Sequence, residues 1–122
     1  MNEVAEKLQK VRDILSDPKH WVKGDFGDWD PNTNTGQVCL LGACLVATTG
    51  AAYQLDDDSD EDQLYRDTAR QLLDCLPGTR YSRVHIDNVA SFNDKPETTH
   101  EDVLKVIDCA IHNVTEESLT KV

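Results

Sequence analysis

The chain alternates between segments that carry a helical hydrophobic period and segments that carry none. In residues 2–16, 60–76 and 99–113, apolar side chains recur at spacings that place them on one face of a helix. Pro18 and Pro77 follow the first two segments and end them, because proline disfavours the helical conformation in the residue before it. We therefore predict amphipathic helices over these ranges.

The third of these segments also carries a start signal. Thr99 and Asp102 occupy the two positions of a capping box, in which each side chain satisfies a backbone N–H of the other residue. We expect this helix to run from Thr99 to Asn113.

A central helix is predicted from a run that is apolar on every side. Residues 38–47 contain almost no polar side chain, and Gly42 and Ala43 stand near the middle. A helix of this length that is hydrophobic all round is buried on most of its faces. We expect it to span Gln37–Thr49, with Thr35 or Asn34 as its N-cap.

Residues 19–36 have neither a helical nor a strand period and contain several glycine and proline breakers. Loops of this length are uncommon in compact domains and are usually functional or disordered. Trp21, Phe26 and Trp29 argue against disorder, because large aromatic rings favour burial. We expect these rings to pin this aromatic loop onto the helices.

Residues 79–96 allow two interpretations. Apolar and polar residues alternate over Arg83–Ile86, which favours a small two-stranded element there. Ile86–Phe92 also fits a two-turn helix that buries Val89 and Phe92, and the sequence leaves both open.

Together these patterns predict a fold that is mostly all-α, a compact bundle of four to five short helices around the buried central helix. A length of 122 residues suits one domain, residues 1–122. Residues 114–122 are expected to form a frayed tail.

The chain is strongly acidic, with a formal net charge of −11. Such a surface repels phosphates and anionic lipids, so direct binding to nucleic acid or to a membrane is disfavoured. The charge fits a well-solvated surface. It also fits a partner with a basic surface, which would be a host or cellular protein. A homo-oligomer is left open.

Targeting signals are not evident in the sequence. No apolar run reaches the length of a membrane span, and the charged N-terminal residues do not resemble a signal peptide. We therefore predict a cytoplasmic protein, in which Cys39, Cys44, Cys75 and Cys109 are free thiols. An even number of cysteines also suits a secreted disulfide scaffold.

Metal sites have little support. Asp28 and Asp30 begin a loop with oxygen ligands at alternate positions, but Thr33 and Cys39 stand where an EF-hand requires glycine and glutamate. The cysteines and histidines lack zinc-ligand spacing, and no phosphate-binding glycine motif occurs. No metal ion and no cofactor is expected.

Cys39 is the most specific enzymatic candidate. It lies near the start of the predicted central helix, where aligned N–H groups would favour the thiolate. His85 or His100 could serve as its base, and Asp94 could orient that base. The alternative is that Cys39 is a small buried hydrophobic residue, which is the usual role of a free cysteine.

Several short motifs occur along the chain in a fixed order. They are Trp21-x-x-Gly24, Cys39-x-x-Gly42-Ala43, Phe92-Asn93-Asp94 and His100-x-x-Val103. Their types and order resemble an uncharacterised family of small proteins from actinobacteria and their phages. The resemblance spans nearly the whole chain, and it implies a source but neither an activity nor any catalytic residue.

The motif residues can be interpreted in two ways. They are either core residues, or they converge on one binding pocket. The candidate binding residues are Trp21, Gly24, Trp29, Cys39, Asn93, Asp94 and His100.

The leading functional hypothesis is a non-enzymatic interaction or regulatory protein of phage origin. In its specific form, it is an acidic inhibitor that occupies the basic surface of a host nucleic-acid-binding protein. One alternative is a small-molecule binder that uses the aromatic loop, residues 19–36. The other is a cysteine-dependent enzyme that uses Cys39, His100 and Asp94.

Overall fold

The predicted mostly helical fold is confirmed. The computed structural model describes residues 3–23, 27–30, 32–33, 35–49, 60–77 and 85–120. In chain order the elements are α1 (Glu3–Leu15), the 3-10 turn η1 (Pro18–His20), β1 (Gly27–Asp30), β2 (Thr35–Val38), α2 (Leu40–Thr49), α3 (Asp60–Leu73), α4 (Asp87–Asp94) and α5 (His100–Thr120).

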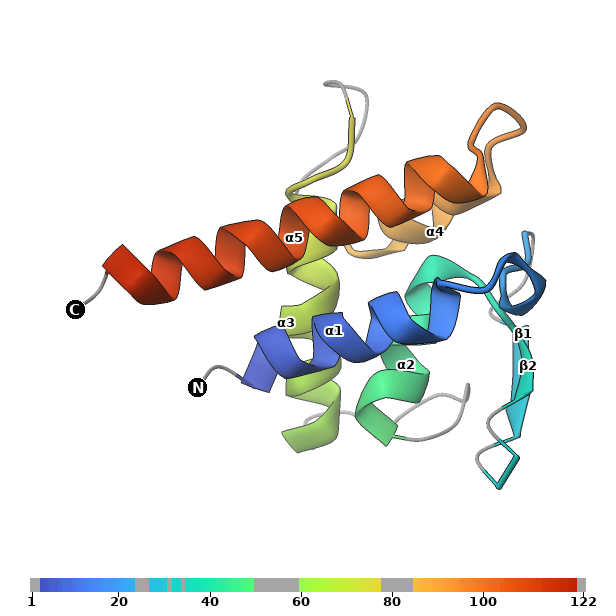
Figure 1. The fold of residues 1–122 in the computed structure, drawn as a ribbon, viewed down its shortest axis with the longest axis horizontal. Helices are drawn as coiled ribbons and strands as arrows, with labels where there is room; N and C mark the ends of the chain where they lie inside the picture. The colour runs from blue at the N-terminus through green and yellow to red at the C-terminus, as the bar shows by residue number, and fades with distance from the viewer. Residues whose placement is uncertain are drawn as a thin grey trace.

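The helices enclose α2. Figure 1 shows α1 and α5 side by side and running in opposite directions, with α3 crossing behind them. α2 contacts α1, α3 and α4, while the β1–β2 hairpin lies at one end of the molecule. No described helix is both long enough and apolar enough to cross a membrane.

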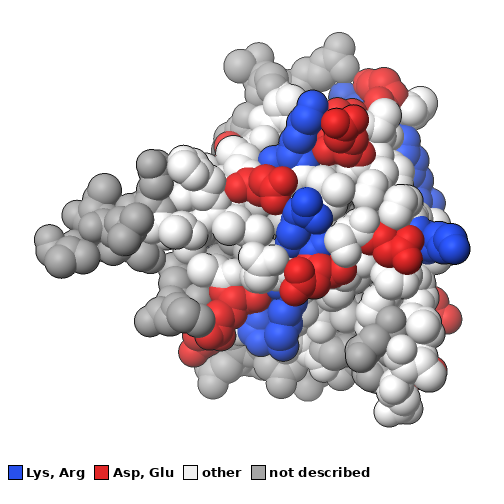
Figure 2. All heavy atoms as spheres, in the orientation of Figure 1, with Lys and Arg blue, Asp and Glu red and all other residues white. Residues whose placement is uncertain are grey.

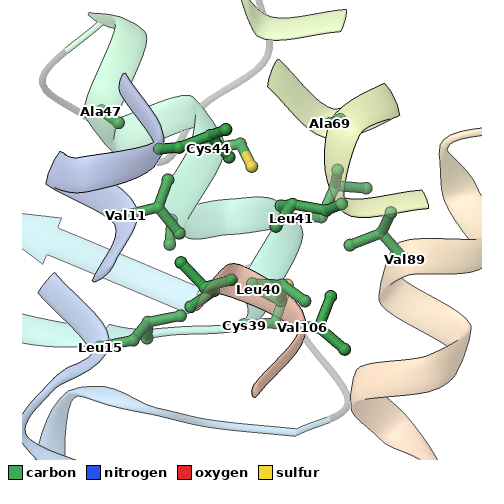
Figure 3. Packing of buried hydrophobic residues seen from close by; sticks show 14 of the residues in the cluster. Val11, Leu15, Cys39, Leu40, Leu41, Cys44, Ala47, Ala69, Val89 and Val106 are labelled. Atoms are coloured by element: carbon green, nitrogen blue, oxygen red, sulfur yellow. The ribbon is translucent and has the colours of Figure 1, made fainter. Parts of the chain in front are cut away.

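α2 forms the centre of the hydrophobic core, as predicted. Every residue from Leu40 to Ala47 is buried, because the helix carries apolar side chains on all of its faces. The four surrounding helices each contribute to the packing. Figure 3 shows Val11 and Leu15 from α1, Ala69 from α3, Val89 from α4 and Val106 from α5 around it.

The start of α2 differs from the prediction. Gln37 belongs to β2, where it pairs with Asp28, so the helix begins only at Leu40. Cys39 precedes it, and Thr35 lies in β2 and cannot act as its cap, whereas Asn34 lies outside the described residues. An apolar run does not mark where a strand gives way to a helix, since Val38 at the end of β2 is buried like the residues of α2.

A two-stranded element lies in the aromatic loop, where none was predicted. β1 and β2 pair antiparallel, and Gly36 adopts a φ of 145°. A Cβ at Gly36 would lie 2.1 Å from the carbonyl oxygen of Asp28, so only glycine fits. The prediction missed these strands because four residues are too few to establish a strand period.

The ambiguous segment after residue 84 is a helix. α4 spans Asp87–Asp94 and buries Val89 and Phe92, as the helical interpretation predicts. Ile86 lies in the turn before α4, and residues 83–84 lie outside the described part of the chain.

The other helices end at different places from those predicted. α3 ends at Leu73, and tighter turns then carry the chain to the buried Leu76. The capping box of α5 is present, because Thr99 N donates to Asp102 Oδ2 and Asp102 N donates to Thr99 Oγ1. α5 does not end at Asn113; it continues to Thr120, through the predicted frayed tail. Val114 is buried and holds this extra length against the core.

The expectation of four free thiols is wrong for one pair. A disulfide joins Cys75 to Cys109, whereas Cys39 and Cys44 are free and buried. The two bonded residues are 34 positions apart, and packing of α3 against α5 brings their Cα atoms to 6.0 Å. No spacing pattern in the sequence predicts that these two cysteines lie close together.

Leu41→Ala should test the central position of α2. Leu41 is fully buried, so the variant loses transfer free energy and leaves a cavity, at a cost of about 2–5 kcal/mol. Leu104→Ala removes the same atoms from a half-buried position on α5 and should cost clearly less. Urea unfolding measures both, and equal losses would contradict the central role of α2.

Candidate functional site

The motif residues meet around the side chain of Asn93, near the end of α4. Asn93 is completely buried. Its Oδ1 accepts from Trp21 Nε1 at 2.5 Å and from the backbone N–H of Leu40 at 3.1 Å. Its Nδ2 donates to the carbonyl of Val22 and to Asp94 Oδ1, both at 3.0 Å. One amide therefore ties the 21–22 segment and the start of α2 to α4.

These four bonds use the full capacity of an amide, which has two acceptor lone pairs and two N–H donors. They also fix its orientation. An indole N–H and a backbone N–H can only donate, so they must face Oδ1. The carbonyl of Val22 accepts only, so it must face Nδ2.

Trp21 reaches this amide from the end of η1. Its indole is also covered by Lys23, whose Nζ lies 5.4 Å from the ring centroid. The same ammonium donates to the carbonyl of Lys95 at 2.6 Å. Lys23 thus fastens the turn after α4 to the segment that carries Trp21.

His100 also contacts Trp21. Its ring is tilted against the indole, with 5.8 Å between the ring centroids. Its Nε2 pairs with the carbonyl of Leu15, so Nε2 must carry a proton. His100 therefore links the start of α5 to the end of α1.

Cys39 caps α2 with its sulfur. Its Sγ accepts from the backbone N–H of Gly42 at 3.2 Å, and its carbonyl accepts from Ala43. Asn93 satisfies the N–H of Leu40, so two of the unpaired donors at this helix start are matched by motif side chains.

Burial raises the pKa of the Cys39 thiol. The N–H groups of Gly42 and Leu41 act in the opposite direction, and the charge of Asp94 raises the pKa further. The loss of hydration raises the pKa more than the N–H groups at the helix start lower it, because Cys39 is only 2% exposed. The group is a thiol and not an activated thiolate.

The catalytic candidates do not form a working set in this arrangement. The sulfur of Cys39 faces Gly42, and Nε2 of His100 faces the carbonyl of Leu15. Asp94 accepts from Asn93, and His85 lies exposed before α4. Cys39, His100 and Asp94 thus each bond within the protein.

Trp29 lies apart from the Asn93 network. Its buried ring meets His20 edge to face, with the centroids 5.3 Å apart, and His20 Nδ1 pairs with the carbonyl of Ile14. Trp21 and Trp29 thus pin the aromatic loop to the helices, as predicted. Phe26 and Gly24 lie outside the described residues.

Two of the hollows on the described surface have linings that do not include Trp21, Cys39, Asn93 or His100. One follows the hairpin and is lined by Trp29, Asp28 and Asp30 among others. The second lies beside the disulfide, between Cys75 and Lys105. The structural interpretation of the motifs rests on their hydrogen bonds within the protein and not on these hollows.

Metal ligands are not grouped in the part of the chain that the structure describes. No set of three His, Cys, Asp or Glu side chains there could hold a metal ion. Asp30 Oδ1 accepts from the backbone N–H of Asn32, which is an ordinary turn contact.

Sequence reasoning found Trp21, Asn93 and His100 but missed Lys23 and the backbone of Leu40. Both act through contacts between segments more than 50 residues apart. The apolar run containing Leu40 signalled burial, but nothing signalled that its N–H needs a side-chain acceptor.

Fold and site together define a mostly helical protein whose motif residues maintain an internal hydrogen-bond network. The chain belongs to DUF6197, a family of unknown function, whose model matches residues 1–113. No curated protein and no solved structure gives a significant match.

Asn93→Ala should weaken the fold severely. It leaves the Trp21 indole N–H and the Leu40 N–H without their acceptor, at about 1–3 kcal/mol for each buried donor. Ser91→Ala, on the exposed side of α4, should change the unfolding free energy by less than about 0.5 kcal/mol. Chemical unfolding of both variants checks this, and similar small losses would show that the network does not hold the fold.

Stability should fall at alkaline pH. Burial raises the pKa of Cys39 and Cys44 above the ordinary value of 9.0, so the folded thiols keep protons that the unfolded chain loses. The free energy of unfolding is therefore constant below that pH and decreases as the pH rises through it. Urea unfolding between about pH 7 and pH 9.5 measures this. In a Cys39→Ala/Cys44→Ala variant, the free energy of unfolding should depend less steeply on pH. An unchanged pH dependence would show that these two thiols do not cause the loss of stability.

Proposed function

We propose that this protein acts by binding a partner protein that has a basic surface, and not by catalysis. In the specific form, it is a phage-derived inhibitor that occupies the nucleic-acid-binding surface of a host protein. The observation that carries the proposal is that the motif side chains are used inside the fold. Function is then left to the surface, whose dominant property is its net charge of −11.

The burial of Cys39 supports a non-enzymatic role. The most specific nucleophile in the sequence is capped, shielded and held as a thiol by its raised pKa. Cys44 is fully buried too. A thiol in such surroundings is chemically inert, which is the usual state of a structural cysteine.

The acidic charge is unevenly spread over the surface. α1 carries as many basic as acidic residues, and Arg12 pairs with Asp108 of α5 at 2.9 Å. Figure 2 shows Lys and Arg interleaved with Asp and Glu over the face formed by α1 and α5. This mixed face offers a basic partner little net attraction.

The hairpin has a different character. Asp28 and Asp30 are exposed on one side of β1, because Trp29 between them turns into the core. The paired residues on β2 are Gln37 and Thr35, so neither carboxylate faces a cation across the strands. We call the side formed by these four residues the acidic hairpin face.

The acidic hairpin face suits contact with a basic surface. Its carboxylates lie on a hairpin whose tryptophan contacts His20. Fixed charges of one sign steer an oppositely charged partner and raise the association rate, and this effect weakens with salt. A nucleic-acid-binding surface is basic for the same electrostatic reason.

The hairpin hollow makes a small cationic ligand the second candidate. Its volume is about 720 Å³, and its lining includes both carboxylates and Trp29. Ligand pockets of this size are common, although most of their lining is apolar. Such a ligand would raise the melting temperature of the protein in the absence of any other protein.

An Asp28→Asn/Asp30→Asn variant tests the proposal. An asparagine in place of Asp30 keeps the oxygen that accepts from Asn32 N, so the turn and the fold should survive. We expect the wild-type protein to capture nucleic-acid-binding proteins from a host lysate at low salt. Added duplex DNA should compete for them, and the variant should associate with them roughly 3- to 10-fold more slowly in surface plasmon resonance.

The matched control is Glu6→Gln/Asp13→Asn, which removes the same charge from the mixed face of α1. This control should associate as fast as the wild type. Equal rates for all three proteins, or capture that salt and DNA do not affect, would contradict the proposal.

A further inference from the structure

The disulfide between Cys75 and Cys109 lies outside the Asn93 network and beyond the proposed binding face. Cys75 follows the C-terminal end of α3, and Cys109 lies in the middle of α5. The loop it closes contains α4, and therefore Asn93. The bond thus joins the two ends of the segment that carries the central amide.

The two cysteines of the disulfide differ in exposure. Cys109 is exposed on α5, whereas Cys75 is half-buried and packs against the core. A thiolate must approach a disulfide sulfur from outside, so access decides which of the two is attacked. Cys109 is the more exposed of the two residues.

Asn113 is placed to assist the departure of Cys75. Its Nδ2 donates to Cys75 Sγ at 3.3 Å and lies 3.8 Å from Cys109 Sγ. A hydrogen-bond donor stabilises a thiolate more than a neutral sulfur. The hollow that Cys75 lines has balanced charges, from Lys95 and Lys105 and from Glu97 and Asp102, so stabilisation of the thiolate rests on the Asn113 amide.

We propose that this disulfide is a site of thiol–disulfide exchange for dithiol reductants, with attack directed at Cys109. A reductant thiolate forms a bond to Cys109 Sγ, the Cys75–Cys109 bond breaks, and Cys75 leaves as a thiolate beside Asn113. The second thiol of the reductant then attacks the mixed disulfide and releases Cys109. Two electrons pass to the protein, and the dithiol becomes a disulfide.

Reduction would release α3 from α5 at this point while leaving the Asn93 network bonded. The exchange does not involve Cys39 or Cys44, which are buried. The reduced protein should therefore remain folded but melt at a lower temperature, because the unfolded chain regains the freedom that the crosslink removed.

Alkylation of the full-length protein tests the assignment. Iodoacetamide without reductant should label no cysteine of the folded, air-oxidised protein, and with dithiothreitol it should label Cys75 and Cys109. Labelling of Cys75 and Cys109 without reductant would overturn the proposal, and so would a disulfide that dithiothreitol reduces only after denaturation.

Glutathione maps the direction of attack. Incubation with glutathione and iodoacetamide should give a product with glutathione on Cys109 and the acetamide group on Cys75. The reverse pattern would overturn the directed attack. Asn113→Ala should slow reduction several-fold, whereas Thr115→Ala, exposed on the same helix, should not. Equal rates would remove Asn113 from the mechanism.

A Cys75→Ser/Cys109→Ser variant distinguishes the effect of breaking the disulfide from any other effect of the reductant on the melting temperature. Dithiothreitol should lower the melting temperature of the wild type by several degrees, to that of the variant, and leave the variant unchanged. A wild-type melting temperature unaffected by reduction would contradict the role of the bond in holding α3 to α5.

Discussion

The structure depends on a single buried amide. Asn93 fills all four of its hydrogen-bonding positions with groups from three parts of the chain. A buried polar group is costly unless it is fully satisfied, so each bond has to form with the others. That requirement fixes where α4 meets the start of α2 and where the 21–22 segment lies. The hydrophobic core allows this arrangement, but non-directional packing alone does not specify it.

The same constraint gives the motif residues structural roles. Trp21 is there to donate to Asn93, and His100 supports the indole while bonding to Leu15. Cys39 caps the helix whose first N–H Asn93 accepts. These residue types are common in active sites, yet here each bonds to the protein itself. A cluster of residue types that are common in active sites can therefore have a structural role as readily as a catalytic one.

The surface divides into regions with different electrostatics. The α1–α5 face balances its charges, as the Arg12–Asp108 pair illustrates, and an exposed pair of this kind adds little stability. The acidic hairpin face holds Asp28 and Asp30 without such balance. The Cys75–Cys109 bond lies away from both, at the join between α3 and α5. Partner binding and redox exchange would thus occupy separate parts of the molecule.

The sequence by itself determined the helical class and the burial of α2, and it offered the helix that buries Val89 and Phe92 as one of two interpretations. These follow from periodicity, which reports the local environment of each residue. It also selected Trp21, Asn93 and His100 without stating their roles. Tertiary structure decided the hairpin, the start of α2, the Asn93 network and the disulfide. Each of these depends on groups that are distant in sequence, or on strands too short to show a period, so no local pattern encodes them.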